Sequence, residues 1–358
     1  MRPLRRSNLV QHRGGAVDRQ VGMHGFRLDV ETHIIAAAMT GVQNLVKCIR
    51  GIGIDIDDMI LGPLASSEAI LTEDEKQVGV ILADIGGGIT DIAVFKDSSS
   101  WHTAILPVAG YQLTRDVAIG LGLPFDVAEE IKKRYSSVMP VYEAQSKTTS
   151  AISADGHDVS YQDLCDIVRT RVEEIMRLIL LELPRSGYES MVPAGLVLTG
   201  GSAKLSGIEV LGRDVLRLPV RVGVPMGMSG ITDVLRDPAH TTSVGLLLWA
   251  GKHEGRRIWK TQGPFRRFVS RIKEKRATLT SIDVGTTKIC TMIAEVDEGG
   301  GIRVVGVGVT PSKGLHKGLV VNINEAREQI RESVRIAEQS SGYKVESAYI
   351  GVTGQLSV

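Results

Sequence analysis

Two glycine-rich turns between apolar strands constrain what this chain can fold into, and the first lies in residues 80–95. This stretch reads as a strand, three consecutive glycines at 86–88 and a second strand. Such a turn exposes backbone N–H groups with no Cβ in the way, and it binds anions, most often phosphate. Asp84 and Asp91 flank the turn. Because carboxylates repel a phosphate, they predict a magnesium ion held largely through water. A plain glycine-rich hairpin without a ligand is the alternative.

Residues 279–294 repeat this plan, with an apolar strand, an Asp-x-Gly turn rich in hydroxyl side chains and a second apolar strand. Residues 196–208 add a third motif, a short apolar strand that ends in Gly-Gly-Ser. Two phosphate-type hairpins in one chain indicate a ligand far more specifically than either hairpin alone.

The three motifs resemble those of the actin and heat-shock-chaperone ATPase superfamily, in which two related half-domains close on ATP and magnesium. The hairpins are similar to its two phosphate motifs. The Gly-Gly-Ser stretch is similar to its adenosine motif, where backbone lies flat against the nucleoside. Five further segments are similar to the FtsA family of bacterial division proteins: residues 25–34, 64–67, 71–75, 244–248 and 317–321. The resemblance covers nearly everything after about residue 20.

The resemblance implies which residues bind ATP. They are Asp84, Gly86, Gly87, Gly88 and Thr90 in the first turn, Asp283, Gly285, Thr286, Thr287 and Lys288 in the second, and Gly200, Gly201, Ser202 and Lys204 in the adenosine motif. Glu129 and Lys132, three apart on one helix face, match the superfamily's ribose-contacting pair. An ordinary surface ion pair is the alternative. Asp84 and Asp283 are the implied magnesium ligands, through water.

The order of the motifs differs from that in FtsA-like proteins, which begin with the hairpin found here at 279–294 and end with the adenosine motif and a basic amphipathic tail. We therefore predict an α/β protein with the actin-like ATPase fold in circularly permuted order. It has two related half-domains with a nucleotide cleft between them and lacks most of the family's inserted subdomain.

This reading divides the chain into five parts. They are a disordered leader at 1–21, the end of the inserted subdomain and second part of the first half-domain at 22–78, the second half-domain at 79–255, a basic amphipathic membrane-targeting segment at 256–277, and the first part of the first half-domain with the start of the inserted subdomain at 278–358.

Two positions depart from the superfamily pattern. Gly62 stands where other members place an acidic or amide side chain that orients the attacking water. Ile89 stands where FtsA and its relatives place a threonine that meets the terminal phosphate. Because hydrolysis requires the phosphate and the water to be held in line, we expect ATP binding with at most very slow turnover.

The composition of the 358 residues limits the choice of partners. A hydrophobic content of 43% suits a large core and two domains or subdomains, and a formal net charge of +1 gives no overall attraction to nucleic acid. Cys48, Cys165 and Cys290 lie far apart without metal-ligand spacing, which fits buried thiols in a reducing cytoplasm. No apolar run approaches 18 residues. We therefore expect a chain that is neither secreted nor membrane-spanning.

Two helices carry the expected partner contacts. Residues 162–183 form the strongest helical pattern, with an apolar stripe that we expect in the core. By resemblance this helix belongs to the subdomain on which FtsA receives the tail of FtsZ, and Arg171 is a candidate contact. Residues 256–277 combine a basic surface with one apolar helix face, which is typical of a helix lying in a membrane interface, with a solvated linker as the alternative. The apolar side chains of this face are Phe265, Phe268, Val269 and Ile272.

The resemblance predicts an ATP-binding cell-division scaffold that tethers FtsZ filaments to the cytoplasmic membrane at the septum, as a peripheral protein on the cytoplasmic side of an anionic membrane. Self-association is expected to be weak, because FtsA-like filaments use the inserted subdomain as a lengthwise contact. Two alternatives stay open. One is a kinase or chaperone-type ATPase of the same fold, and the other is a non-functional rearranged product.

Overall fold

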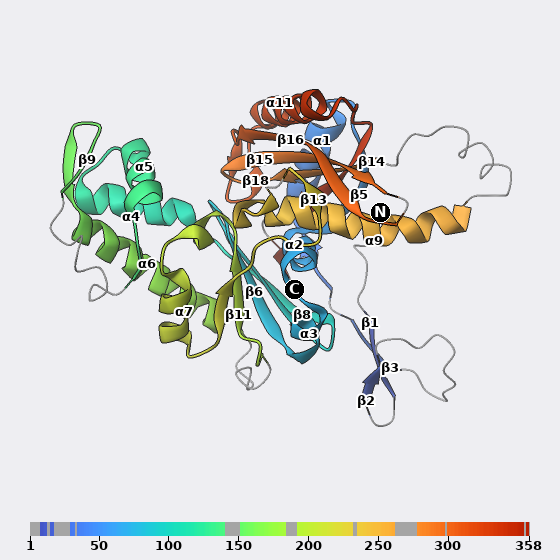
Figure 1. The fold of residues 1–358 in the computed structure, drawn as a ribbon, viewed down its shortest axis with the longest axis horizontal. Helices are drawn as coiled ribbons and strands as arrows, with labels where there is room; N and C mark the ends of the chain where they lie inside the picture. The colour runs from blue at the N-terminus through green and yellow to red at the C-terminus, as the bar shows by residue number, and fades with distance from the viewer. Residues whose placement is uncertain are drawn as a thin grey trace. The chain divides into compact units, whose positions relative to one another are not determined.

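The computed structural model describes residues 8–12, 15–17, 29–32, 34–139, 151–183, 192–231, 235–261, 278–297, 299–353 and 356–357. The chain divides into two compact units (Figure 1). Unit 1 comprises Met1–Ala36, Leu71–Gly223 and Leu356–Val358, and unit 2 comprises Ala37–Ile70 and Val224–Gln355. Each unit contains a mixed sheet and helices, which confirms the predicted α/β class.

Unit 1 is built on a five-stranded sheet in the order β12-β11-β6-β7-β8. Its strands are β6 (Val80–Ile85), β7 (Thr90–Lys96), β8 (Ser99–Leu106), β11 (Leu196–Thr199) and β12 (Val220–Val222). β6, β7 and β8 form an antiparallel meander, β11 runs parallel to β6, and β12 runs parallel to β11. β6 and β7 are buried along nearly their whole length, as their continuous apolar runs predict.

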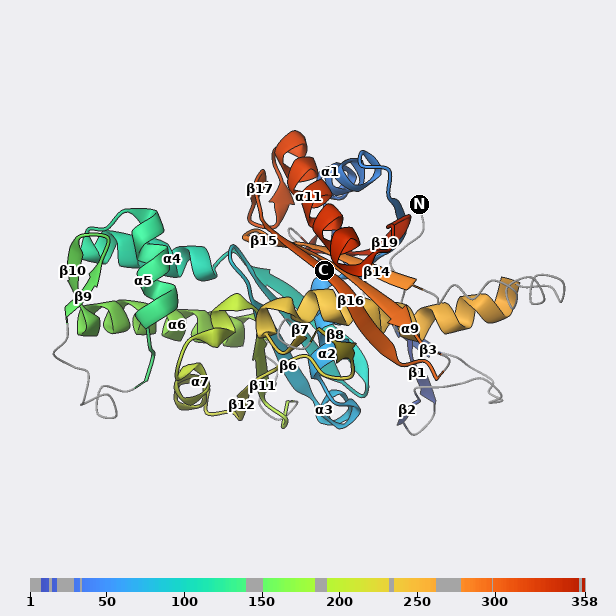
Figure 2. The same cartoon turned by 45° about the horizontal axis from the view of Figure 1, so that its top comes forward.

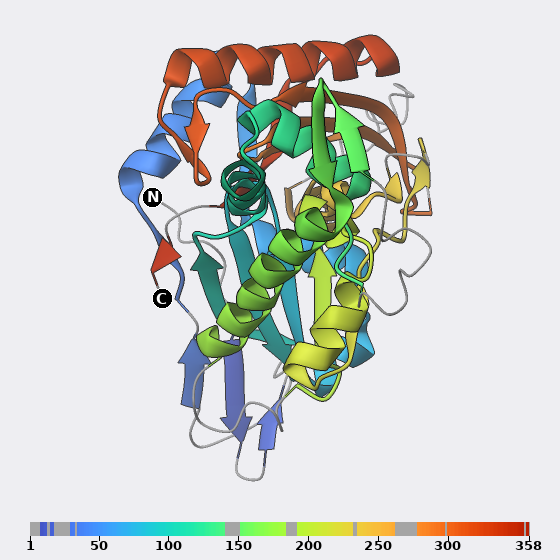
Figure 3. The ribbon, with the colours of Figure 1, turned by 90° about the vertical axis from the view of Figure 1, so that its left-hand side faces the viewer.

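Five helices belong to unit 1 in its described part: α3 (Glu73–Val78), α4 (Gly110–Leu121), α5 (Phe125–Tyr135), α6 (Tyr161–Glu182) and α7 (Ile208–Leu216). α6 crosses the sheet with α7 beside it (Figure 3). The apolar stripe of α6 lies in the core, as predicted; its buried residues are Leu164, Val168, Val172, Ile175, Met176 and Ile179. The hairpin of β9 (Ala151–Ala154) and β10 (His157–Ser160) precedes it.

Unit 2 is built on a sheet in the order β13-β16-β15-β14-β19-β5. Its strands are β5 (Asp55–Leu61), β13 (Ser229–Gly230), β14 (Thr278–Val284), β15 (Lys288–Val296), β16 (Ile302–Pro311) and β19 (Ser347–Val352). β14, β15 and β16 form an antiparallel meander. β19 runs parallel to β14, and β5 runs parallel to β19.

Helices cover both faces of this second sheet. α11 (Ile323–Ser341) and α1 (Met39–Arg50) lie together on one face, while α9 (Thr241–Thr261) and α2 (Gly62–Ile70) lie on the other (Figures 1 and 2). The alternation along β14 explains this. Ile282 and Val284 enter the apolar core shared with α1 and α11, whereas the Ser281 hydroxyl donates to the Ser243 carbonyl of α9.

Apart from the two-residue edge strand β13, the unit 2 sheet has the same strand order and directions as the unit 1 sheet: a three-stranded meander followed by two parallel strands. In unit 1 the five strands follow one another along the chain. In unit 2 the first four come from residues 278–352, but the fifth, β5, comes from Asp55–Leu61. β5 therefore joins this sheet from a part of the chain that precedes the other strands.

α9 runs through Thr261, into the segment that the sequence analysis sets apart at 256–277. Gly255 inside a helix costs only about 1 kcal/mol relative to alanine, and the basic residues around it are good helix formers. α9 also belongs to unit 2. Residues 224–255, which the sequence analysis assigned to the second half-domain at 79–255, therefore lie in unit 2.

The first residues also differ from the expected disordered leader at 1–21. β1 (Asn8–His12) pairs with β2 (Gly15–Val17) and with β3 (Asp29–Thr32) in a small antiparallel sheet. The sequence shows only a short alternation here among arginines, which is a weak strand signal. β4 (Ala36–Ala37) pairs with β20 (Leu356–Ser357).

The predicted membrane face of Phe265, Phe268, Val269 and Ile272 lies outside the described residues. Of the helices that the structure describes, none is long and apolar enough to cross a bilayer.

Candidate functional site

The triple-glycine turn of unit 1 forms where the sequence predicts it, between β6 and β7. The Gly86 N–H donates to the Ile89 carbonyl at 3.1 Å, which closes the turn. Asp84 and Asp91 stand directly opposite each other on the two strands, so their side chains share one face of the sheet. Two like charges in this arrangement destabilise each other unless a cation lies nearby.

Two side chains at the end of this turn are buried. Ile89 is only 7% exposed. Thr90 is fully buried, and its hydroxyl donates to the Val108 carbonyl at 2.7 Å. Thr90 therefore ties the turn to the segment after β8.

The adenosine motif lies against the same turn. Gly200 has φ +87°, and a Cβ there would come 2.4 Å from Oδ1 of Asp84, so only glycine lets the motif approach. The Ser202 hydroxyl donates to the Gly86 carbonyl at 3.2 Å. Gly201 and Lys204, in the short 3₁₀ helix η3 (Gly201–Lys204), are exposed.

The first turn of α4 completes this assembly. The Gly110 N–H donates to the Gly86 carbonyl at 3.1 Å, and the Tyr111 N–H donates to the Gly87 carbonyl at 2.6 Å. Gly86 therefore accepts hydrogen bonds from both the adenosine motif and α4. Two segments predicted to bind the nucleotide, the triple-glycine turn and the adenosine motif, are thus joined with α4 through one carbonyl.

Glu129 and Lys132 of α5 are tied to α4. Lys132 is 8% exposed, and its ammonium donates to the Gly110 carbonyl at 3.1 Å, to the Thr114 hydroxyl at 2.7 Å and to Glu129 at 2.6 Å. Thr114 and Lys133 also donate to the Glu129 carboxylate. The pair is therefore not the ordinary surface ion pair of the alternative interpretation.

This network shifts the pKa values of both Glu129 and Lys132. Burial alone would raise the pKa of Glu129, but the adjacent Lys132 charge and the hydrogen bonds from Lys132, Lys133 and Thr114 outweigh it and lower the pKa. Burial lowers the pKa of Lys132, and the contact with Glu129 only partly offsets this. Lys132 depends on Glu129 to stay charged in a buried position.

The Asp-x-Gly turn of unit 2 joins β14 to β15. The Gly285 N–H donates to the Lys288 carbonyl at 3.0 Å. Asp283 accepts from the Ser243 hydroxyl of α9 at 3.4 Å. Thr286 is half-buried and Thr287 is exposed.

Lys288 ends this turn. Its ammonium lies 3.1 Å from Nδ1 of His240, which is in the 3₁₀ helix η4 (Pro238–His240) at the start of α9. Cys290, on β15, is fully buried, and burial raises the pKa of its thiol to about 11, as expected for an inert thiol.

Several residues of these two clusters were not found from the sequence. Thr114, Ser243, His240 and Gly318 each contact a predicted site residue. Each lies in an ordinary helix or hairpin pattern, far along the chain from its contact, and so carried no local signal. Within the described residues, no cluster of three or more His, Cys, Asp or Glu could hold a metal ion.

A shallow groove of about 430 Å³ lies between α4 and α6 in unit 1. Its lining residues are Asp116, Asp166, Ile167, Thr170, Arg171 and Glu174. The Arg171 guanidinium pairs with Asp116 and with Glu174. Arg171, predicted as a partner contact, is therefore held across the groove by two carboxylates.

Comparison with known proteins shows which proteins this chain is similar to. Residues 81–245 match the sequence model of the cell division protein FtsA. The FtsA of Pseudomonas aeruginosa is 44% identical over 236 residues, 65% of this chain and 57% of that protein. Those of Neisseria meningitidis and Escherichia coli K12 are 41% and 33% identical, over 67% and 64% of this chain and 59% and 57% of theirs. The chain thus spans less than two thirds of the relatives it matches.

Solved structures are similar over about half of the chain. MreB5 of Spiroplasma citri bound to ADP has a TM-score of 0.44 and 18% identity, covering 56% of this chain and 61% of its own. The PilM–PilN type IV pilus biogenesis complex has a TM-score of 0.43 and 18% identity, covering 58% and 57%. The argument for kinship comes from sequence: residues 81–245 carry the triple-glycine turn, the adenosine motif and α6. Through these residues, the chain is similar to the cell division protein FtsA.

Proposed function

We propose that this chain is an ATP-binding, actin-like scaffold of cell division that tethers FtsZ filaments to the cytoplasmic face of an anionic membrane. The observation that carries the nucleotide part is the assembly in unit 1, where the triple-glycine turn, the adenosine motif and α4 are bonded through the Gly86 carbonyl. Unit 2 repeats the turn on a sheet of the same order.

The residues fit ATP and magnesium. The close approach of Gly200 to Asp84 leaves bare backbone beside the turn, which suits a flat nucleoside and its phosphates. The facing carboxylates of Asp84 and Asp91 favour a nearby cation, which Asp84 and Asp283 would hold through water. Magnesium would neutralise phosphate charge there.

The proposal includes slow turnover. Ile89 is buried and has no hydroxyl, and a Cβ on Gly62 would meet Cγ2 of Thr353 at 2.8 Å. Neither position offers a group that orients water or the terminal phosphate.

Calorimetry and a single-turnover assay with Mg·ATP, on wild type and Ile89→Thr, test this part. We expect binding with very slow hydrolysis, and a modest gain in affinity for ATP over ADP in the variant, on the order of one hydrogen bond to a charged group. Brisk hydrolysis by the wild type would contradict the assignment of these positions.

We further propose that the chain is a circular permutation of the family order. Support comes from β5, which lies at the edge of the unit 2 sheet beside β19 although it precedes all the other strands of that sheet in the chain. The corresponding strand of unit 1, β12, follows its four partners in sequence.

For FtsZ, the groove between α4 and α6 is the proposed contact, with Arg171 as its cation. Three carboxylates and this one guanidinium line the groove, so a partner segment with both charged signs suits it better than a purely acidic one. Arg171→Glu should abolish co-pelleting with FtsZ filaments, while Arg177→Glu, outside the groove on the same helix, should not. Equal loss in both would point to a general charge effect.

For the membrane, the proposed anchor is the face of Phe265, Phe268, Val269 and Ile272, which places the protein peripherally on the cytoplasmic side. Self-association is proposed to be possible but weak.

A further inference from the structure

A short hairpin, β17 (Leu315–His316) and β18 (Leu319–Val320), lies beside the Asp-x-Gly turn of unit 2. Its two tip residues, Lys317 and Gly318, have φ of +47° and +76°. Positive φ at both central positions is what a two-residue type I′ turn requires, and glycine is favoured there. The tip is therefore a tight, defined turn.

Two hydrogen bonds join this segment to the Asp-x-Gly turn. The Gly318 N–H donates to Oγ1 of Thr286 at 3.0 Å. The N–H of Ser312, just before the hairpin, donates to the Thr287 carbonyl at 3.0 Å. The hairpin thus contacts the turn through one side chain and one backbone group.

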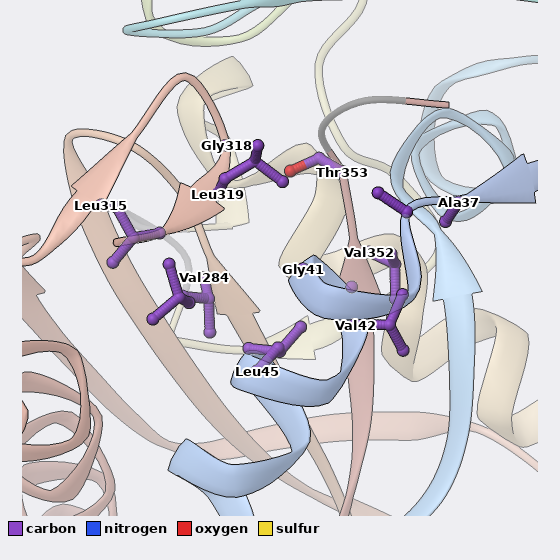
Figure 4. A pocket seen from close by; sticks show the side chains of 13 residues that line it. Ala37, Gly41, Val42, Leu45, Val284, Leu315, Gly318, Leu319, Val352 and Thr353 are labelled. Carbon is purple, nitrogen blue, oxygen red and sulfur yellow. The ribbon is translucent and has the colours of Figure 1, made fainter. Parts of the chain in front are cut away.

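The base of the hairpin is anchored in unit 2. The Asn44 side-chain amide of α1 donates to the Val320 carbonyl at 3.2 Å. Leu315 and Leu319 pack toward Val284 and Val42 around a cavity of about 30 Å³ (Figure 4). Such a volume holds about one water molecule, so this is a nearly filled packing interface and no ligand pocket. The tip is held where it is by the core beneath it.

The contact fixes what the Thr286 hydroxyl can do. A hydroxyl has one proton to donate and two lone pairs that accept. The Gly318 N–H uses one lone pair, so the hydroxyl proton stays available for another acceptor, and the bond polarises the hydroxyl into a stronger donor. Such a donor suits an anionic oxygen such as that of a phosphate.

We propose that the β17–β18 hairpin is a positioning element of the nucleotide site, in which Gly318 orients and polarises the Thr286 hydroxyl toward a phosphate oxygen. This rests on the proposed nucleotide function and adds to it a residue that acts through Thr286 without touching the ligand. The exposed Lys317 at the tip carries a separate positive charge. The experiment therefore includes a variant that lacks this charge.

The contact itself is tested first, on the full chain without nucleotide. Hydrogen exchange at the Gly318 amide should be faster in Thr286→Val, which lacks the acceptor, and unchanged in Thr286→Ser, which keeps it. An amide that exchanges at the same rate in all three proteins would overturn the inference, whatever the protein binds.

The second test is a double-mutant cycle on the affinity for Mg·ATP, measured by calorimetry. Gly318→Val forces a β-branched residue into positive φ and displaces the tip. With Thr286 present it should weaken binding about three- to tenfold, the size of one hydrogen bond. In a Thr286→Val background it should weaken binding no further. Lys317→Gly keeps the turn and removes the cation, so it should retain wild-type affinity.

Equal weakening by Gly318→Val in both backgrounds would show that the hairpin acts by general packing and would overturn the inference. A loss in Lys317→Gly as large as in Gly318→Val would overturn it in favour of a charge effect. A wild-type chain that binds no Mg·ATP would instead refute the proposed nucleotide function.

Discussion

Gly200 and Gly201 are neighbours in the adenosine motif, but the structure treats them very differently. A Cβ on Gly200 would lie 2.4 Å from Asp84 and 2.5 Å from the Ile85 carbonyl, at φ +87°. A Cβ on Gly201 meets nothing within 4 Å. We expect Gly200→Ala to lower the free energy of unfolding by about 1–3 kcal/mol and to weaken Mg·ATP binding.

Gly201→Ala is the matched control and should leave the free energy of unfolding within about 0.5 kcal/mol of wild type. Urea unfolding and calorimetry on both variants measure these effects. Equal tolerance of the two substitutions would mean that the motif does not lie against Asp84 as described.

Glu129 makes stability depend on pH. Its folded pKa lies below the ordinary value of 4.5, so its stabilisation is complete above 4.5 and is lost as the pH falls through the folded pKa. Glu129→Gln should therefore destabilise the protein at pH 7, where buried Lys132 loses its charged partner. The difference from wild type should shrink as the pH falls below 4.5. Urea titrations at pH 7 and below 4 measure it, and a difference that stays constant would exclude this pair as its source.

The residues that the sequence revealed at this scale are those with a local signature. Gly86 to Gly88 and Asp84 stand in a short motif whose backbone conformation follows from the residues themselves. Thr114 and Gly318 contribute a hydroxyl and an N–H across distances of 18 and 32 residues, and nothing near them in the sequence marks these contacts. Ile89 was recognised as a departure, but its burial required the packed sheet.

At the scale of elements, α9 packs on α2 in unit 2 through a glycine. A Cβ on Gly245 would lie 1.9 Å from the Ala65 carbonyl, which is backbone and cannot move aside. A Cβ on Gly251 would lie 2.7 Å from Cδ1 of Ile302, the end of a flexible side chain, and at least 3.5 Å from its other neighbours. We expect Gly245→Ala to cost about 1–3 kcal/mol of unfolding free energy and Gly251→Ala clearly less.

Thermal or urea unfolding of the two variants checks this order. A larger loss in Gly251→Ala would mean that α9 does not pack on α2 through Gly245.

The proposed membrane helix is a prediction at the same scale. Its four apolar side chains and surrounding basic residues should give weak, reversible binding to anionic vesicles, with about 1 kcal/mol from each basic residue near the surface. Phe268→Glu places a charge on the apolar face and should abolish flotation with liposomes. Equal flotation of both proteins would identify the segment as a linker.

Most elements could be predicted from periodicity, because the α6 stripe and the continuous apolar runs of β6 and β14 repeat over enough residues. The full length of α9 could not, because Gly255 weakens a helix without ending it, and the long apolar first half decides where the helix runs. The β1–β3 sheet could not be predicted either. Its residues read as a polar leader, and only the pairing of the strands in the structure identifies them as a sheet.

At the scale of the whole molecule, the order of segments is separable from the fold. The unit 2 sheet requires β5 beside β19, which the present chain achieves although the two strands lie far apart in sequence. Under the proposed permutation, moving residues 278–353 in front of residues 34–261 gives the family order. We expect this reordered chain to melt within a few degrees of the present one, because loop closure changes slowly with loop length. Failure of the reordered chain to fold would contradict the permutation.

The central proposal is that the triple-glycine turn and the Asp-x-Gly turn both bind ATP. It is tested most directly by the melting temperature of the full chain at increasing Mg·ATP, for wild type, Asp84→Ala in unit 1 and Thr286→Val in unit 2. A ligand at a hundred times its Kd stabilises the folded chain by about 2.7 kcal/mol. We predict a wild-type melting temperature that rises with ATP concentration and a reduced rise in each variant. No rise at millimolar ATP, or a rise that only one of the two variants reduces, would contradict the account.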